Sequence, residues 1–200
     1  MIRAVVFDLG QVLSSPETLF TAPAELLGVD PDAFESLYWE GRSDYDAGGS
    51  DSDYWGPILT KLGKPAALET VQQLAALDAR MWLGVRPAAL QILRDVRAAE
   101  REVAVLTNSP TALDLSLLKS PVAEEADYWF VSASMGVMKP SKAAFYRVTE
   151  VLELEPAQIA FIDDRQPNVA AAEAFGWKAH LFSDDADTRA WLVTLGVLEP

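Results

Sequence analysis

The chain of 200 residues contains no cysteine and a single histidine, His180. The absence of cysteine excludes disulfides, thiolate nucleophiles and thiolate metal sites, and one histidine excludes a histidine-cluster metal site. No apolar run approaches the roughly 20 residues that span a bilayer. The N-terminus leads directly into a short strand-like run rather than through a basic region and an apolar signal core. From these absences we expect a cytoplasmic protein.

Positive charge is scarce, because 16 lysine and arginine residues stand against 30 acidic residues, for a formal net charge of −14. The long-range field of such a chain repels polyanions, so we expect no nucleic-acid partner and no binding to an anionic membrane surface. A small anionic substrate would need a local positive site. Half of the residues are hydrophobic, enough for one globular unit with a substantial core.

Short runs rich in β-branched and aromatic residues recur along the chain, at residues 2–7, 103–107, 127–132, 159–163 and 178–182. Helical patterns separate them. This alternation predicts a Rossmann-like α/β fold, with a parallel sheet and helices on both of its faces.

Helix signals support this assignment. Pro87 is placed to open a helix, Ser109 and Pro110 fit N-cap and first-turn positions, and Gly176 is placed to end one. A further helix is predicted from an apolar stripe of Phe145, Val148, Val151 and Leu152.

Residues 16–81 lack the strand signal and show only helical segments. We expect them to form a helical cap inserted into a core of residues 1–15 and 82–200. Because the insertion follows the first strand, it would lie over the carboxyl edge of the sheet, where open α/β folds bind ligands. Within it, Ser50 or Ser52 is expected to cap a helix after a glycine-containing connector.

Polar residues that suit one reaction follow several of the predicted strands, where parallel strands converge on one crevice. They are Asp8, Thr107, Asn108, Lys139, Asp163 and Asp164. A carboxylate can attack phosphorus, a hydroxyl and an amide can hold phosphoryl oxygens, and a lysine can offset their charge. Two further carboxylates can bind Mg2+. The set is complete for phosphoryl transfer through an aspartyl intermediate.

Each of these residues also has a purely structural interpretation. Asp8 can be an ordinary strand end or helix cap, residues 107–110 can be a turn with a helix cap, and lysines such as Lys139 are mostly solvated. Asp163 and Asp164 are harder to explain this way, because adjacent carboxylates repel unless a cation or hydrogen bonds compensate. Their combination in this order favours the chemical interpretation.

Four stretches, VVFDLGQVL, VLTNSP, GVMKPSKAAFYRVTEVL and IAFIDDRQPNVAAAEAFG, resemble the motifs of the haloacid dehalogenase-like hydrolase superfamily, most of whose members are phosphatases. The likeness covers nearly the whole chain and is weak only in the helical insertion. The insertion resembles the small helical cap of the subgroup that includes sugar-phosphate phosphatases.

The resemblance implies a role for each site residue. Asp8 would be the nucleophile, and its carboxylate, that of Asp164 and the carbonyl of Gly10 would bind Mg2+, with Asp163 supporting the metal site. Thr107 and Asn108 would hold the phosphoryl group and Lys139 would stabilise it, which makes Asp8, Thr107 and Lys139 the catalytic set. Asn168 stands where relatives often have an acidic residue, so its contact with the metal would be through water.

One position departs from the family pattern. Most phosphatases of the superfamily carry a second aspartate two residues after the nucleophile as general acid and base, and here that residue is Gly10. The missing aspartate would protonate the leaving group and activate the attacking water. Each of these effects commonly raises the reaction rate roughly 100- to 10,000-fold.

Three functions remain open on these grounds. The leading one is Mg2+-dependent hydrolysis of a small phosphorylated metabolite, such as a sugar phosphate. The alternatives are a metal-independent dehalogenase, in which the aspartate attacks carbon, and a non-catalytic phosphate- or metal-binding protein that acts through a partner. For the last, the insertion offers aromatic residues that either form a contact surface or pack inside a small cap: Tyr38, Trp39, Tyr45, Tyr54 and Trp55.

The stretch YWEGRSDY of the insertion alternates aromatic and cationic groups, which suits an anionic, hydroxylated ligand. We therefore expect Trp39 and Arg42 to face the active site and to set specificity. The alternative is a solvated arginine on a helix whose tryptophan packs inward.

Overall fold

The computed structural model describes residues 1–199, so residue 200 of the expected core lies outside the described residues. All of its sheet pairings are parallel, in the order β3-β2-β1-β4-β5. The strands are β1 (Ala4–Phe7), β2 (Glu102–Thr107), β3 (Tyr128–Val131), β4 (Ile159–Asp163) and β5 (Lys178–Leu181). Each lies within one residue of a predicted run or inside it, and the predicted α/β fold is confirmed.

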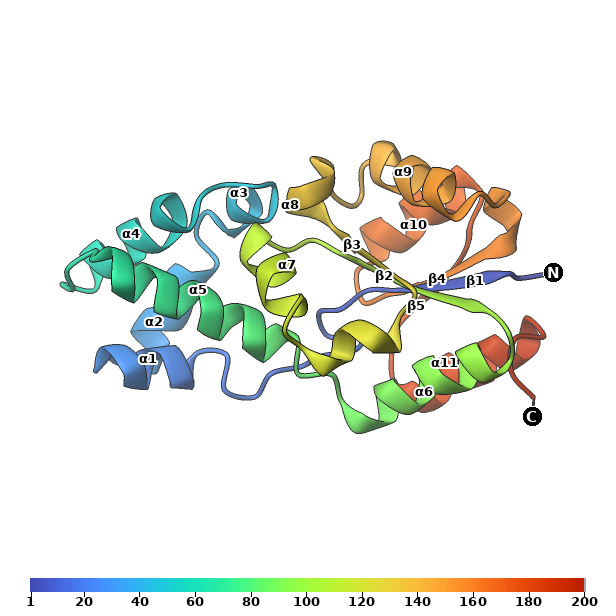
Figure 1. Ribbon diagram of the computed structural model, residues 1–200, viewed down its shortest axis with the longest axis horizontal. Helices are drawn as coiled ribbons and strands as arrows, with labels where there is room; N and C mark the ends of the chain where they lie inside the picture. Colours follow the sequence, from blue (N-terminus) through green and yellow to red (C-terminus); the bar gives the residue numbers. More distant parts are fainter. Residues whose placement is uncertain (200) are drawn as a thin grey trace.

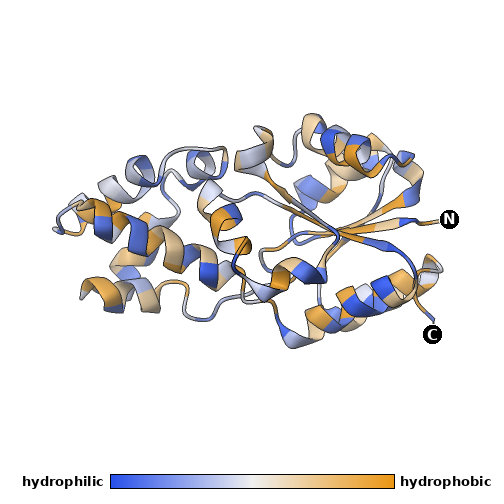
Figure 2. Cartoon of the chain, viewed as in Figure 1, coloured by the Kyte–Doolittle hydropathy of each residue, from blue (hydrophilic) through white to orange (hydrophobic). Residues whose placement is uncertain are grey.

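Helices cover both faces of this sheet (Figure 1). On one side lie α9 (Lys142–Leu152) and α10 (Gln166–Phe175), and on the other lie α6 (Pro87–Ala98) and α11 (Asp185–Thr194). Successive side chains of β1 alternate between two hydrophobic clusters, so that Val5 packs with the α6 side and Val6 with the α9 side. Burial on both faces explains why the strands carry mainly hydrophobic residues (Figure 2).

The remaining elements of this part are short. They are α7 (Thr111–Leu117), the 3-10 helix η1 (Pro121–Glu125), α8 (Ser132–Met135) and the 3-10 helix η2 (Pro156–Gln158).

Most helix ends agree with the sequence signals. Pro87 is the first residue of α6, and Gly176 caps α10 at a φ of 109°, a conformation that suits glycine. The assignment of Ser109 was wrong, because Pro110 is the N-cap of α7 and the Ser109 side chain bonds elsewhere. Val151 was also misassigned, since it is 46% exposed. It lies about 100° around α9 from its buried neighbour Leu152.

Between β1 and α6 the chain forms five helices that we call the helical unit: α1 (Thr21–Leu27), α2 (Pro31–Tyr38), α3 (Arg42–Asp46), α4 (Asp51–Lys61) and α5 (Leu68–Trp82). They lie together beyond the carboxyl ends of the strands (Figure 1). Ser50 caps α4 by accepting a hydrogen bond from the Asp53 N–H at 3.1 Å, one of the two predicted caps.

The helical unit has its own aromatic core. Tyr38, Tyr45, Tyr54 and Trp55 are buried, as expected of residues that pack inside a small cap. Trp39 differs from them because it is 55% exposed. No helix among residues 1–199 combines the length and the apolar character that crossing a bilayer requires.

Candidate active site

The polar residues that follow the strands meet in one cavity of about 300 Å3 at the carboxyl edge of the sheet. From the sheet side it is lined by residues that include Asp8, Gly10, Thr107, Asn108, Lys139 and Asp164. From the helical unit it is lined by Trp39, Arg42, Ser43, Asp46 and Trp82. Asp163 does not line the cavity but lies directly beneath it, in contact with Lys139.

Asp8 directly follows β1, the central strand of the sheet. Its N–H donates to the carbonyl of Ile162 at 2.9 Å, which continues the pairing with β4 and fixes the backbone. Its Oδ1 accepts the Leu9 N–H at 2.7 Å and lies 2.8 Å from Lys139 Nζ. Burial raises the pKa of Asp8 to about 7, with Lys139 opposing the rise and Asp163 adding to it. A cation beside this carboxylate would favour its charged form.

Lys139 is not a solvated lysine, because only 2% of its surface is exposed. Its Nζ lies 2.7 Å from Asp163 Oδ2 as well as 2.8 Å from Asp8 Oδ1. Burial by itself would lower the pKa of this amine, but the two carboxylates outweigh burial and raise the pKa above its usual value. Lys139 is therefore held as a cation between Asp8 and Asp163.

Asn108 holds the backbone of Lys139 with both ends of its side-chain amide. Asn108 Nδ2 donates to the Lys139 carbonyl at 2.9 Å, and Asn108 Oδ1 accepts the Lys139 N–H at 2.9 Å. This pairing was not expected from the sequence, in which the amide was assigned to the phosphoryl group. The role of Asn108 in holding the phosphoryl group stays a prediction, and the structure shows in addition that its amide positions Lys139.

Asp163 is fully buried and hydrogen-bonded at both oxygens. Its Oδ1 accepts the Arg165 N–H at 2.8 Å and Asn168 Nδ2 at 2.9 Å, while Oδ2 faces Lys139 Nζ. These bonds supply the compensation that the adjacent carboxylates require. The Asn168 amide is used here to hold Asp163, a contact that the sequence did not reveal.

Asp164 is half-buried and lines the cavity. Burial raises its pKa, and the charge of Asp163 adds to the rise. One oxygen each of Asp8, Asp163 and Asp164 lie within 4.8 Å of one another. When all three are ionised, the carboxylates exceed the ammonium of Lys139 by two negative charges, which one divalent cation would offset. The donor set therefore fits Mg2+, which accepts oxygen ligands and retains water.

Gly10 lines the cavity beside this cluster. Among residues 1–199, no hydrogen bond ends on its carbonyl oxygen, so that oxygen remains available as a metal ligand. A Cβ at this position would lie 3.5 Å from Trp82 Cζ3, an ordinary van der Waals distance.

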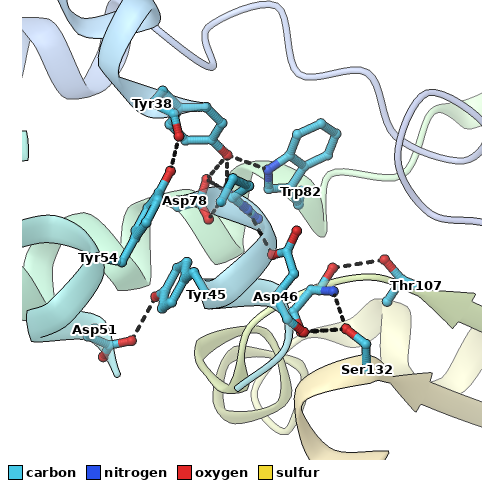
Figure 3. Close-up of polar contacts among 11 residues, drawn as sticks. Tyr38, Tyr45, Asp46, Asp51, Tyr54, Asp78, Trp82, Thr107 and Ser132 are labelled. Atoms are coloured by element: carbon cyan, nitrogen blue, oxygen red, sulfur yellow. Dashed lines mark hydrogen bonds and ion pairs between the residues drawn. The ribbon is translucent and has the colours of Figure 1, made fainter. Parts of the chain in front are cut away.

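The loop after β2 is tied to the helical unit by two serines (Figure 3). Thr107 Oγ1 lies 2.8 Å from Ser109 Oγ, and the Ser109 N–H donates to Ser132 Oγ at 2.9 Å. Ser132 Oγ donates in turn to the carbonyl of Asp46, at the end of α3, at 2.6 Å. Ser132 is fully buried, and nothing in its local sequence distinguishes it from a solvent-exposed helix cap.

Arg42 and Trp39 both line the cavity. The alternative drawn from the sequence was a solvated arginine beside a tryptophan that packs inward, and the structure shows the opposite. Arg42 is only 8% exposed, whereas the tryptophan is the exposed member. Arg42 Nε lies 2.8 Å from Asp46 Oδ1, and its Nη1 lies 3.1 Å from Asp78 Oδ2. Burial raises the pKa of Asp46 to about 6, although Arg42 opposes the rise.

The hydroxyl of Tyr38 joins this ion pair to the wall of the cavity (Figure 3). It donates to Asp78 Oδ1 at 2.5 Å and accepts from Arg42 Nη1 and, at 3.0 Å, from Trp82 Nε1. Burial raises the pKa of Tyr38 well above its ordinary value, and Asp78 adds to the rise, so the hydroxyl keeps its proton.

Comparison with known proteins agrees with this geometry. A family model described as haloacid dehalogenase-like hydrolase matches residues 2–176. The chain is 26% identical over 179 residues to a sesquiterpene phosphatase of Aspergillus oryzae, covering 87% of this chain and 86% of the relative. It is 25% identical over 188 residues to (S)-2-haloacid dehalogenase 1 of a Pseudomonas species, covering 88% and 82%.

A similar solved structure is that of a HAD family enzyme from Bacteroides thetaiotaomicron in complex with magnesium and inorganic phosphate. It superposes with a TM-score of 0.70 at 20% identity, covering 92% of this chain and 95% of the other, and supports the fold. The match of the family model over most of the chain and the cluster of aspartates at the end of the sheet lead to one conclusion: the chain belongs to the haloacid dehalogenase-like hydrolases.

Proposed function

We propose that this hydrolase is a Mg2+-dependent phosphatase that cleaves a small phosphorylated metabolite through an aspartyl-phosphate intermediate. The observation that carries the proposal is the convergence of Asp8, Asp163 and Asp164 on one point beside a cavity. Of the three, Asp163 is bonded at both oxygens, whereas Asp164 faces the cavity and is half-buried. The arrangement leaves Asp8 and Asp164 to serve a ligand.

In this proposal Asp8 is the nucleophile. The Leu9 N–H and Lys139 Nζ both contact its Oδ1, which orients the carboxylate and leaves Oδ2 to attack phosphorus. Breaking of the ester P–O bond leaves the phosphoryl group on Asp8 and releases an alkoxide, which takes its proton from solvent water. Water then attacks the phosphorus, which releases inorganic phosphate, frees the Asp8 carboxylate and returns a proton to solvent. The Thr107 hydroxyl and Lys139 line the cavity beside Asp8 and hold the phosphoryl oxygens. Asn108 contributes by fixing the backbone of Lys139.

The metal ligands in this proposal are the carboxylates of Asp8 and Asp164 and the carbonyl of Gly10, with Asp163 supporting them from below. When bound, Mg2+ would neutralise charge on the phosphoryl oxygens. Residues 16–81 act as the cap over a core of residues 1–15 and 82–200. The cytoplasm is the compartment in which the protein acts.

A dehalogenase is the second candidate, and Gly10 is the observation that favours it. A halide leaves carbon without a proton, so a site without the second acid suits that reaction. The identity to the haloacid dehalogenase, 25%, is close to the 26% for the phosphatase. Against this candidate, a metal-free site would leave the nucleophile Asp8 partly protonated at neutral pH, because burial raises its pKa to about 7.

One experiment separates the candidates. Turnover of p-nitrophenyl phosphate and of (S)-2-chloropropionate is measured with Mg2+, with EDTA, and after Mg2+ is restored. We expect ester hydrolysis that stops in EDTA and returns with Mg2+. Haloacid turnover that persists in EDTA, without any ester hydrolysis, would establish the dehalogenase. Retained phosphate binding with no turnover of a wide panel of esters would establish a binding protein. Asp8→Asn serves as the control because it removes the nucleophile of either reaction.

A further inference from the structure

The cavity has an apolar wall beside the reacting groups. Its lining includes four large apolar residues, of which Leu9 and Trp82 are buried and Trp39 is the most exposed: Leu9, Trp39, Trp82 and Met138. Leu9 directly follows Asp8, Met138 directly precedes Lys139, and the Trp82 ring approaches Gly10. A group that is esterified to a phosphoryl at Asp8 would therefore meet hydrocarbon surface.

The charged groups and the indole N–H that the helical unit brings to the cavity are engaged with one another (Figure 3), and its one other polar side chain there is the exposed hydroxyl of Ser43. The charge of Arg42 is matched by Asp46 and Asp78, which leaves this cluster with one net negative charge when all three are ionised. The Trp82 N–H is taken up by the Tyr38 hydroxyl. A sugar hydroxyl that lay against the Arg42 cluster would give up its bonds to water and meet donors and acceptors that are already paired, which costs binding energy. A second anionic group would meet no uncompensated cation in this cluster.

Trp39 supplies a fixed surface at the same place. Its ring packs edge-on against Tyr38, with centroids 4.8 Å apart and an interplanar angle of 86°, and against Phe20 at 6.3 Å. Trp39 is exposed, whereas Trp55 and the tyrosines of α2 to α4 are buried. The indole is therefore held by its neighbours while more than half of its surface remains open to a ligand.

We propose that the substrate is a phosphate monoester of a compact hydrocarbon or aryl alcohol that carries no second charge, and that Trp39 is the residue on which this group packs. The inference rests on the proposed phosphatase function and narrows its substrate class from small phosphorylated metabolites to apolar esters. The cavity volume of about 300 Å3 is at the lower end of the range for ligand pockets, which restricts the alcohol to a small one.

Arg165 is the cation that most directly opposes this inference. It lines the cavity from the sheet side, is exposed, and among residues 1–199 has no ion-pair partner. If Arg165 receives a second anion of the substrate, an ester that carries a carboxylate should be preferred, so the test includes one.

The test compares esters of matched size by calorimetry, with the Asp8→Asn variant in Mg2+ so that the esters remain intact. Cyclohexylmethyl phosphate and glucose 6-phosphate are both primary esters on a six-membered ring, and 6-phosphogluconate adds a carboxylate. We expect cyclohexylmethyl phosphate to bind at least about tenfold more tightly than the other two. Adding Trp39→Ala should reduce this preference about tenfold, equivalent to about 1.4 kcal/mol, while Trp39→Phe should retain most of it. Leu26→Ala, an exposed apolar residue of α1 outside the cavity, is the matched control and should change nothing.

The inference would be overturned by equal or tighter binding of glucose 6-phosphate, by a preference that survives Trp39→Ala, or by tighter binding of 6-phosphogluconate that Arg165→Ala abolishes. Binding of none of the three esters would also refute it. Failure of the phosphatase proposal has a different signature, because the native enzyme would then hydrolyse no ester while the calorimetry still ranked their binding.

Discussion

Gly10→Asp tests whether the missing carboxylate limits the reaction. The backbone of Gly10 does not lie in the left-handed region, and the new Cβ would sit 3.5 Å from Trp82 Cζ3, so the Cβ fits without rearrangement. The new carboxyl would be near Asp8 and Asp164 in a partly buried cavity. Burial and neighbouring negative charge both raise a carboxyl pKa, which keeps a fraction protonated at neutral pH as a general acid requires.

The gain should depend on the leaving group. A simple alkoxide is a poor leaving group without a proton, so release of an alkyl alcohol should become faster by a factor within the roughly 100- to 10,000-fold span of general acid catalysis. A nitrophenolate departs unprotonated, so release from p-nitrophenyl phosphate should change much less.

The assay is single-turnover release of the alcohol, compared for cyclohexylmethyl phosphate and p-nitrophenyl phosphate. Single turnover isolates ester cleavage from the later hydrolysis of the aspartyl phosphate. Gly10→Asn is the matched control, since it has almost the same shape and no acidic proton, and Gly10→Ala reports the effect of the Cβ alone. An equal change for both esters, or a gain that Gly10→Asn reproduces, would show that Gly10 does not mark a missing acid.

Three further outcomes follow from the contacts of the site. Asp164→Asn should raise the Mg2+ concentration for half-maximal activity by about tenfold or more, because it replaces a charged ligand with a neutral one; an unchanged titration would remove this residue from the metal site. Asn108→Ala should lower kcat about tenfold to a hundredfold, because Lys139 is displaced. It should also lower the free energy of unfolding by about 1 to 2 kcal/mol, because two hydrogen bonds are lost. A change in KM alone would instead indicate that Asn108 binds the ligand directly. Because burial raises the pKa of Asp8 from 3.8 to about 7, ionising Asp8 in the metal-free protein destabilises the fold as pH rises from about 4 to about 7. In urea unfolding without Mg2+, the unfolding free energy of Asp8→Asn should therefore rise relative to that of the native chain over this pH interval, by a few kcal/mol at most, and the difference should level off above it. A difference that does not change with pH would contradict the raised pKa.

The sequence by itself determined the sheet and the edge of the sheet at which the candidate site residues meet. Strand composition is a local property, and five short apolar runs separated by helical patterns permit few arrangements other than a parallel sheet with covered faces. Residues that end such strands must converge at one edge, so the meeting of Asp8, Thr107 and Asp164 around one cavity followed from their positions in the chain. The sequence also predicted Ser50 as a helix cap, because its hydrogen-bond partner Asp53 is only three residues away along the chain.

Only the tertiary structure decided how the side chains are used. The Asn108 amide pairs with a backbone 31 residues away, and the Arg42 charge is matched by Asp78, 36 residues away. Local sequence cannot reveal such partners, because they depend on how separate segments approach one another. The same holds for Trp39 and Arg42. The sequence predicted that both face the cavity, but only the structure shows that the arginine is buried between Asp46 and Asp78. It also shows that the indole packs on Phe20 and Tyr38 and stays exposed.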